Sequence, residues 1–225
     1  ILPNLSKYIH TKNEKKINFI QNKAVQLSLF LSLPATIALL FAYNEITSSL
    51  FGYGSFDETS IKNAGIALFY FAFGLPAFAL IKIFSSFLFA RHNTKIPFYF
   101  SIFSVVINIT LSLLFFNEYG FIIIPIATTI SSWINAFILF IYLINEKYFT
   151  FQKNFFFSFI KILFSCVIMG LVFKNLINLF SENLIYSSNS KLFYMIIIIL
   201  IAFTIYLITS IITKAFKISD INLKY

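Results

Sequence analysis

The sequence predicts an all-α fold, a polytopic transmembrane helix bundle with six complete transmembrane helices and the end of a seventh. Of its 225 residues, 59% are hydrophobic and only 11% are charged, whereas soluble domains average about 25% charged residues. Several uncharged stretches reach the roughly 20 residues that a helix needs to span a bilayer. Short charged connections separate these stretches, so long apolar helices and short polar turns alternate along the chain.

The chain begins inside an apolar segment. Residues 1–9 have the composition of the last turns of a membrane helix, and residues 10–22 form a polar, amphipathic connection. The first residue is Ile and no signal-peptide pattern follows it, so we interpret the sequence as the C-terminal part of a longer protein. The first complete span covers residues 23–43. Pro34 near its middle predicts a kink, because proline removes one backbone hydrogen bond.

The first exposed connection covers residues 45–60. Its segment 46–51 fits a short amphipathic helix that lies along the membrane interface. Thr59 or Ser60 is available to cap the next helix. The second span, residues 61–90, is long enough that we expect it to tilt or to project beyond the bilayer.

Four more spans follow. A basic turn that contains Arg91 ends the second span, and Pro97 suits the first turn of the third. The remaining spans, separated by short polar connections, comprise residues 96–116, 121–144, 155–173 and 192–213. A polar tail ends the chain.

Basic and acidic residues divide between the two sides of the membrane. If residues 10–22 are placed in the cytoplasm and the sides alternate from there, most of the 17 Lys and Arg residues fall in cytoplasmic connections. The acidic residues on the opposite side are Glu45, Asp57, Glu58, Glu118 and Glu182. This positive-inside pattern predicts a cytoplasmic C-terminus. It also explains the formal charge of +9 better than a nucleic-acid partner, since the chain has no Arg-rich patch.

Enzyme and metal signatures are absent from the sequence. No pair of carboxylates lies within a span, and neither HExxH nor GxSxG occurs. The single cysteine, Cys166, lies in an apolar run, so it indicates neither a disulfide framework nor a metal cluster. His10 and His92 lie in or next to basic connections, as solvated interface residues do. We therefore predict no enzymatic activity, no cofactor and no metal.

Lys82 is the ionisable residue that lies well inside a span. A charge at membrane depth is costly and tends to face a bundle interior or an aqueous cavity. Two interpretations stay open for Lys82: its stem snorkels toward the headgroups or pairs structurally, or its ammonium contacts an anionic substrate or cavity water. Arg91 follows in the basic turn and is a second candidate for the substrate path.

Uncharged polar residues inside the spans supply two further candidates for the substrate path, Asn108 and Asn135. Asn108 shares a helix face with Ser112, four residues later. Side chains of this kind also bond across neighbouring helices and let them approach closely. Helix–helix contact is therefore the alternative interpretation for both asparagines.

The stretch GLPAFALIKIFSSFLFARHNTKIP, residues 74–97, has a familiar pattern, and LSLPATIAL and GFIIIPIATTISSWINAFIL extend it. These segments resemble the C-terminal half of the lipid II flippase family (MurJ/MviN), within the MATE-like exporter superfamily. The residues that match the family pattern are Gly74, Leu75, Pro76, Lys82, Ala90, Arg91, Thr94, Lys95 and Pro97. Phe89 and Asn93 stand where the family usually has Tyr and Asp, and Ser86–Phe87 stand where it usually has Pro-Gly. The resemblance covers residues 1–150, and the last two spans match in position and length only.

The resemblance implies a MATE-like fold in the bacterial inner membrane and a role in peptidoglycan biosynthesis. Flippases of this family move the undecaprenyl-linked peptidoglycan precursor, lipid II, outward by alternating access. On that template, residues 1–22 end one membrane helix and connect it to the next, and residues 23–145 form four helices of the C-terminal lobe. Residues 146–225 form two additional helices, with a lipid-tail groove, and a cytoplasmic tail. The implied partners are the lipid-linked oligosaccharide, membrane lipids and a missing N-terminal lobe that holds the head-group arginines.

Other functions stay open at this point. A sibling of the same superfamily, either a polysaccharide-lipid flippase or a cation-coupled multidrug exporter, would share the fold. An exporter would favour carboxylates inside its spans, and these spans contain none. From another class, the chain could be a non-transporting membrane fragment.

Overall fold

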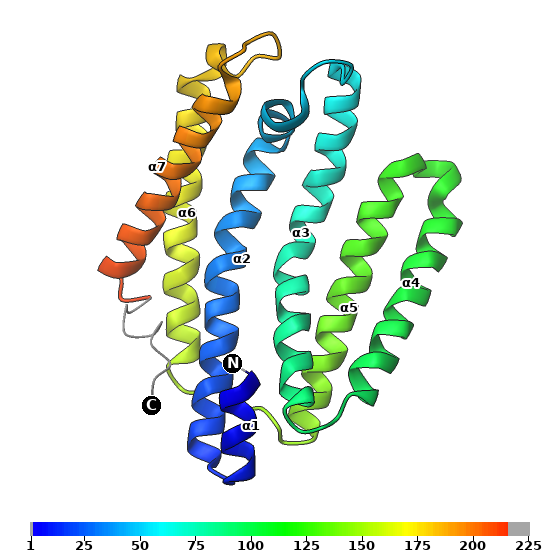
Figure 1. The fold of residues 1–225 in the computed structure, drawn as a ribbon, viewed down its shortest axis with the longest axis vertical. Coiled ribbons are helices and arrows are strands. Elements are labelled where there is room, and N and C mark those ends of the chain that lie inside the picture. Colours follow the sequence, from blue (N-terminus) through cyan, green and yellow to red (C-terminus); the bar gives the residue numbers. More distant parts are fainter. Residues whose placement is uncertain (1, 216–225) are drawn as a thin grey trace. The chain divides into compact units, whose positions relative to one another are not determined.

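The computed structural model describes residues 2–215 (Figure 1). Within this range the chain is helical and contains no strand, so the all-α class is confirmed. The α-helices are α1 (Leu2–His10), α2 (Glu14–Phe51), α3 (Glu58–Phe89), α4 (Lys95–Tyr119), α5 (Ile123–Asn145), α6 (Phe155–Leu179) and α7 (Lys191–Ile212). Two 3₁₀ turns, η1 (Gly120–Ile122) and η2 (Ser181–Asn183), lie in the connections. Most of the predicted polar tail lies outside the described residues.

Five helical segments in the described range are long and apolar enough to cross a membrane. One of them, Lys95–Asn145, is 51 residues long and reverses at η1, so it contains both α4 and α5. The reversal needs Gly120, whose φ of 58° lies in the left-handed region that side chains with a Cβ rarely adopt. The six predicted spans therefore correspond to α2 through α7, and α1 corresponds to the end of the seventh.

The chain forms two compact units, and each unit contains part of α2 and part of α3. Unit 1 comprises Ile1–Ser32 and Gly74–Phe159, and unit 2 comprises Leu33–Phe73 and Ile160–Tyr225. The sequence predicts a different division, with boundaries at residues 22 and 145 between segments of the whole transporter. That division stays a prediction.

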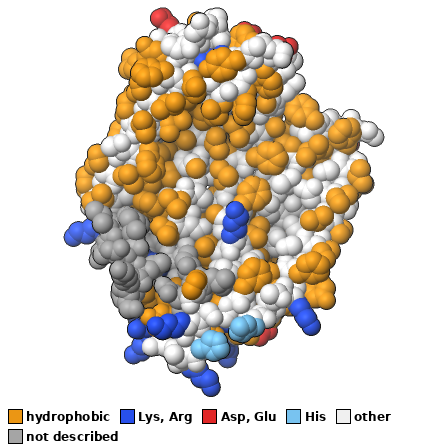
Figure 2. Space-filling view, in the orientation of Figure 1, with side chains coloured by type: hydrophobic (Ala, Val, Ile, Leu, Met, Phe, Trp, Pro, Cys, Tyr) orange, Lys and Arg blue, Asp and Glu red, His pale blue; other side chains and the backbone are white. Residues whose placement is uncertain are grey.

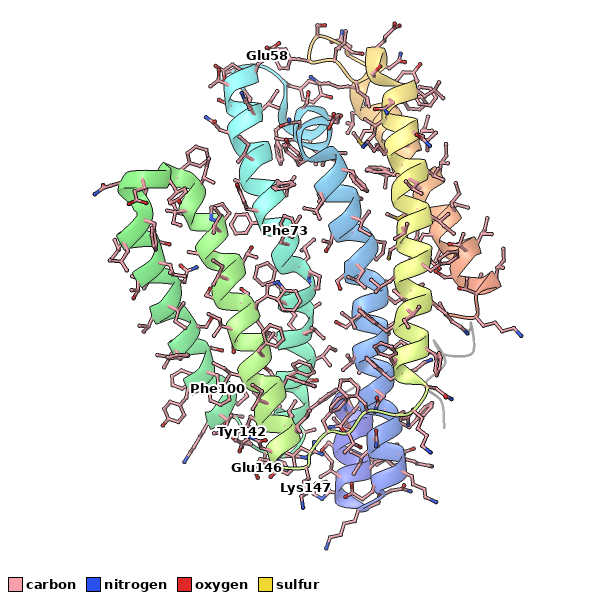
Figure 3. The ribbon with its side chains drawn as sticks, turned by 180° about the vertical axis from the view of Figure 1, so that it is seen from behind. Glu58, Phe73, Phe100, Tyr142, Glu146 and Lys147 are labelled. Atoms are coloured by element: carbon pink, nitrogen blue, oxygen red, sulfur yellow. The ribbon has the colours of Figure 1, made fainter. Side chains whose placement is uncertain are left out.

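In unit 1, α4 and α5 form an antiparallel pair that is in contact along its length. Near one end of the pair the rings of Phe100 and Tyr142 meet edge to face, 5.9 Å between centroids. Figure 3 shows both rings at the end where Glu146 and Lys147 lie. Only Pro97 and Ser104 of α4 are buried. The rest of α4 presents a largely apolar surface of the kind that lipid covers.

In unit 2, α2 changes direction at Ala42, after which its last turns are seen nearly end-on (Figure 1). Ala42 has non-helical dihedral angles, φ −136° and ψ 31°. Ala42 lies eight residues after Pro34, where the sequence predicts a kink, and the kink at Pro34 stays a prediction. The short helix expected over residues 46–51 is confirmed as a helix. It is continuous with α2, so the connection to α3 is only residues 52–57.

Asp57 caps α3. Its Oδ1 accepts a hydrogen bond of 2.8 Å from the backbone N–H of Ser60, the usual arrangement of an N-cap carboxylate. Thr59 and Ser60, expected as caps, lie inside the helix instead. The helix begins earlier than expected because Asp57 satisfies its first free N–H groups.

Candidate functional site

Arg91 lies in the turn between α3 and α4 and holds the connection between α5 and α6. One guanidinium nitrogen donates to the carbonyl oxygen of Phe87 at 3.0 Å, and the other donates to the carbonyl oxygen of Tyr148 at 3.1 Å. The guanidinium also stacks over the Tyr148 ring, 4.5 Å from its centroid. The pKa of Arg91 is lowered from its ordinary value, mainly by burial. The charges of Tyr148 and Glu14 oppose this shift without cancelling it. These contacts anchor the connection formed by residues 146–154 to Arg91 at Tyr148.

Asn22 holds the same connection from α2. Its amide nitrogen donates to the carbonyl oxygen of Thr150 at 2.8 Å, and its amide oxygen accepts from the backbone N–H of Gln152 at 3.0 Å. Asn22 is 4% exposed and contacts the Asn18 side chain as well. Sequence reasoning missed this residue because its partners lie about 130 residues away. The available signal was an asparagine just before an apolar run.

Two histidines and several basic side chains gather at this end of unit 1 (Figure 2). The rings of His10 and His92 are edge to face, with 6.1 Å between their centroids. His92 has a φ of 59°, so the turn after α3 is tight. Basic connections are thus concentrated at one end of the unit, as the charge pattern predicts.

Asn108 joins α4 to α5. Its amide nitrogen donates to Thr128 Oγ1 at 2.9 Å and lies 3.5 Å from Ser131 Oγ. One turn earlier, Ser104 Oγ donates to the carbonyl oxygen of Ser131 at 2.8 Å. These bonds support the interpretation of Asn108 as a helix–helix contact.

Asn135 follows Ser131 by one turn of α5. Its side chain is 6% exposed, and its Oδ1 has no hydrogen-bond partner among the described residues. A buried acceptor without a partner costs about 1–3 kcal/mol. The Oδ1 atom of Asn135 can therefore accept a hydrogen bond from a group outside the described residues.

Lys82 is exposed on α3. Leu80 and Phe84, two residues away on either side, line an apolar pocket in unit 1. Because 3.6 residues make one helical turn, Lys82 lies on the opposite side of α3 from both. It also lies about 13 Å along the helix from Arg91. Lys82, Arg91, Asn108 and Asn135 all lie in unit 1. None of the hydrogen bonds described for Arg91 and Asn108 joins either one to another of the four.

Unit 2 contains a buried ammonium that sequence reasoning did not single out. Lys191, the first residue of α7, is 1% exposed. Its Nζ donates to the carbonyl oxygens of Gly52 at 2.6 Å and Tyr186 at 2.7 Å. The rings of Tyr53 and Tyr186 flank it, with centroids 4.5 Å and 4.7 Å from Nζ. Lys191 therefore joins the α2–α3 connection to the α6–α7 connection.

The described helices define a polytopic α-helical membrane protein, because their spans are apolar and carry large hydrophobic side chains on the exposed surface. The family model described as lipid II flippase MurJ matches residues 1–195. The chain belongs to the lipid II flippase MurJ family and is a multi-pass protein of the inner membrane.

Individual relatives agree with this family. The probable lipid II flippase MurJ of Rickettsia prowazekii (strain Madrid E) is 31% identical over 172 residues, 76% of this chain and 34% of that protein. The corresponding protein of Rhizobium meliloti (strain 1021) is 37% identical over 140 residues, 62% of this chain and 26% of that protein. A solved structure of lipid II flippase MurJ in the inward closed conformation has a TM-score of 0.72 and 26% identity. The match covers 93% of this chain and 41% of the chain in the solved structure.

The chain spans about a third of the length of its Rickettsia relative. Matches of this extent confirm the predicted family and the predicted class of fold. The residues around Lys82 and Arg91, on which the predicted resemblance rests, lie within the matched range 1–195.

Proposed function

We propose that this chain is the C-terminal part of a lipid II flippase, which moves undecaprenyl-linked peptidoglycan precursor across the inner membrane by alternating access. The observation that carries the proposal is the family match over residues 1–195. The similarity to a structure named as an inward closed conformation also supports alternating access, since that name implies more than one state. On this proposal the protein is a transporter rather than an enzyme.

The proposal includes a partner, the remaining N-terminal part of the transporter. This chain covers only 41% of the solved flippase that it matches, so the rest of the transport path comes from residues outside it. The lipid-linked oligosaccharide is then the substrate, and membrane lipids surround the apolar face of α4.

We also propose that the basic end of unit 1 lies in the cytoplasm and that the C-terminus lies on the same side. The connections at this end contain Lys12, Arg91 and Lys147, and the connection at the other end of α3 contains Asp57 and starts at Gly52. Cytoplasmic loops carry the excess of Lys and Arg in membrane proteins.

For the substrate path we propose different roles for the four candidate residues. Lys82 is an exposed cation within a span, and Asn135 has a buried oxygen with no partner among the described residues. These two are the candidates for contact with substrate. Arg91 and Asn108 already use their donors inside unit 1, so their proposed role is to position the helices that form the path.

Genetic complementation tests the proposal. The full-length gene is expressed in cells depleted of their own lipid II flippase, together with Lys82→Ala and the matched control Lys62→Ala, and membrane levels are measured by immunoblot. We expect the wild type and Lys62→Ala to restore growth and Lys82→Ala to fail at normal levels. Growth with Lys82→Ala would remove Lys82 from the path. Failure of a well-expressed wild type would contradict the lipid II assignment and favour a sibling exporter.

A further inference from the structure

An apolar pocket of about 300 Å³ lies in unit 1 between α2, α3, α5 and the start of α6. All of its lining side chains are hydrophobic, and most are aromatic. They include Leu29 from α2, Phe84 from α3 and Trp133 and Phe140 from α5. Among the described residues, α6 contributes Phe155, Phe156 and Phe159 to its lining and α7 contributes none.

The lining of this pocket favours an apolar guest such as a hydrocarbon chain. Water in a cavity needs two to four polar partners, and apolar cavities instead take up apolar guests. Phe84 lies five residues before the end of α3, which is about 7.5 Å along the helix. The pocket therefore lies at acyl-chain depth in one leaflet, since half of the hydrocarbon core is about 15 Å thick.

A lysine lies in the connection that supplies part of the pocket wall. Phe151 and Phe155 both line the pocket, and their ring centroids are 4.8 Å apart. Lys153 lies between them in the sequence and is exposed. Asn22 bonds the backbone just before it, at Thr150 and Gln152. Lys153 thus belongs to an anchored connection whose neighbouring residues line the pocket.

We propose that this pocket binds one acyl chain of an anionic phospholipid, whose phosphate lies beside Lys153. Basic groups next to clefts between membrane helices on the cytoplasmic side recognise anionic lipid headgroups. The choice of leaflet rests on the orientation given under the proposed function. The pocket and the adjacent lysine stand without it.

Trp133 gives a direct readout, because it is the single tryptophan of the chain and lines the pocket. The purified chain is placed in phosphatidylcholine nanodiscs that contain a brominated lipid, either brominated phosphatidylglycerol or brominated phosphatidylcholine. Bromine atoms on the acyl chains quench tryptophan fluorescence on contact. We expect quenching by brominated phosphatidylglycerol to be saturable and stronger, and unlabelled phosphatidylglycerol to compete with it. Lys153→Gln should weaken this preference about fivefold, the effect of one lysine near an anionic lipid. Lys62→Gln, at the start of α3, should leave it unchanged.

Two further variants fill the pocket. Leu80→Phe and Val25→Phe each add volume to its wall, and either one should reduce quenching by both brominated lipids to the level of bulk lipid contact. Size-exclusion profiles and Trp133 emission in unlabelled nanodiscs show that each variant is folded. Two variants guard against one that misfolds.

Three outcomes would overturn the proposal. They are equal quenching by the two brominated lipids, quenching that both pocket-filling variants leave unchanged, and displacement of phosphatidylglycerol by undecaprenyl phosphate at equal mole fraction. The last result would assign the pocket to a prenyl chain. Because fluorescence in defined bilayers needs no transport, these results are independent of whether the gene complements a flippase.

Discussion

The Nζ atom of Lys191 lies 2.6 Å from the carbonyl oxygen of Gly52, which is 139 residues away in the sequence. Glycine is required at this approach, because a Cβ on residue 52 would lie 3.1 Å from Nζ and 2.5 Å from the carbonyl oxygen of Ser48. Tyr186 closes the arrangement, since its hydroxyl donates to the carbonyl oxygen of Phe56 at 3.2 Å. The two connections on this side of unit 2 are therefore bonded to each other.

Lys191→Gln should destabilise unit 2. The substitution shortens the side chain and removes a charged donor from two buried carbonyl oxygens, and hydrogen bonds of charged groups contribute about 1.5–3 kcal/mol each. We expect a lower thermal midpoint in detergent, measured by the loss of monodisperse protein after heating. Lys62→Gln is the matched control on an exposed lysine. Equal midpoints for both variants would show that the buried contacts contribute nothing.

Arg91→Lys should release the connection between α5 and α6. A lysine presents a single ammonium and cannot donate from two separate nitrogens to Phe87 and Tyr148 while stacking on a ring. We expect faster hydrogen exchange over residues 146–154, with little change in α7. Lys95→Arg, at the exposed start of α4, is the control. Unchanged exchange in Arg91→Lys would mean that Asn22 alone anchors the connection.

Asn108→Leu should lower stability, whereas Asn135→Leu should not. Replacing Asn108 removes its bond to Thr128 and should cost about 1 kcal/mol. Replacing Asn135 removes a buried oxygen that has no partner among the described residues, so the thermal midpoint should stay the same or rise. If Asn135 contacts substrate, Asn135→Leu should nevertheless fail to complement. A large loss of stability in Asn135→Leu would reveal a partner outside the described residues.

Asp57 should make stability depend on pH in the acid range. Hydrogen bonds from Ser60 lower the pKa of Asp57 below its ordinary value of 3.8. A lowered pKa in the folded state means that the carboxylate stabilises the fold above pH 3.8 and that this stabilisation is lost as the pH falls through the folded value. At pH values below 3.8, we expect the thermal midpoint of the wild type to decrease more steeply with falling pH than that of Asp57→Asn. The asparagine keeps a cap but does not titrate. Glu182→Gln should follow the wild type, and identical slopes for Asp57→Asn and the wild type would contradict the role of the cap.

The apolar runs were sufficient to predict every long helix, because bilayer length constrains them strongly. Hydropathy does not detect helical segments that lie outside the bilayer. The part of α2 between Glu14 and the predicted start of the span at residue 23 was therefore not predicted. The break at Ala42 was not predicted, because alanine carries no local signal for a change of helix direction. The positions of Asn108 and Arg91 were predictable, but their bonding partners were not.

Contacts between distant residues explain the remaining misses. Lys191 and Asn22 act on backbone carbonyls more than 100 residues away, and nothing in the local sequence around either residue indicates such partners. The pocket beside Trp133 is formed by four separate segments. In a single sequence, its aromatic residues look like ordinary lipid-facing side chains.

The short reversal at η1 has a consequence for biosynthesis. Because α4 and α5 follow each other so closely, both emerge from the ribosome almost together, and Asn108 finds Thr128 within 20 residues of chain. The hydrogen bond between Asn108 and Thr128 can thus form without waiting for later helices, which lowers the cost of placing these two polar side chains in hydrocarbon. The pair can leave the insertion machinery as a hairpin. By contrast, the connection from α5 to α6 reaches its final position only when Asn22, made much earlier, is in place to receive it.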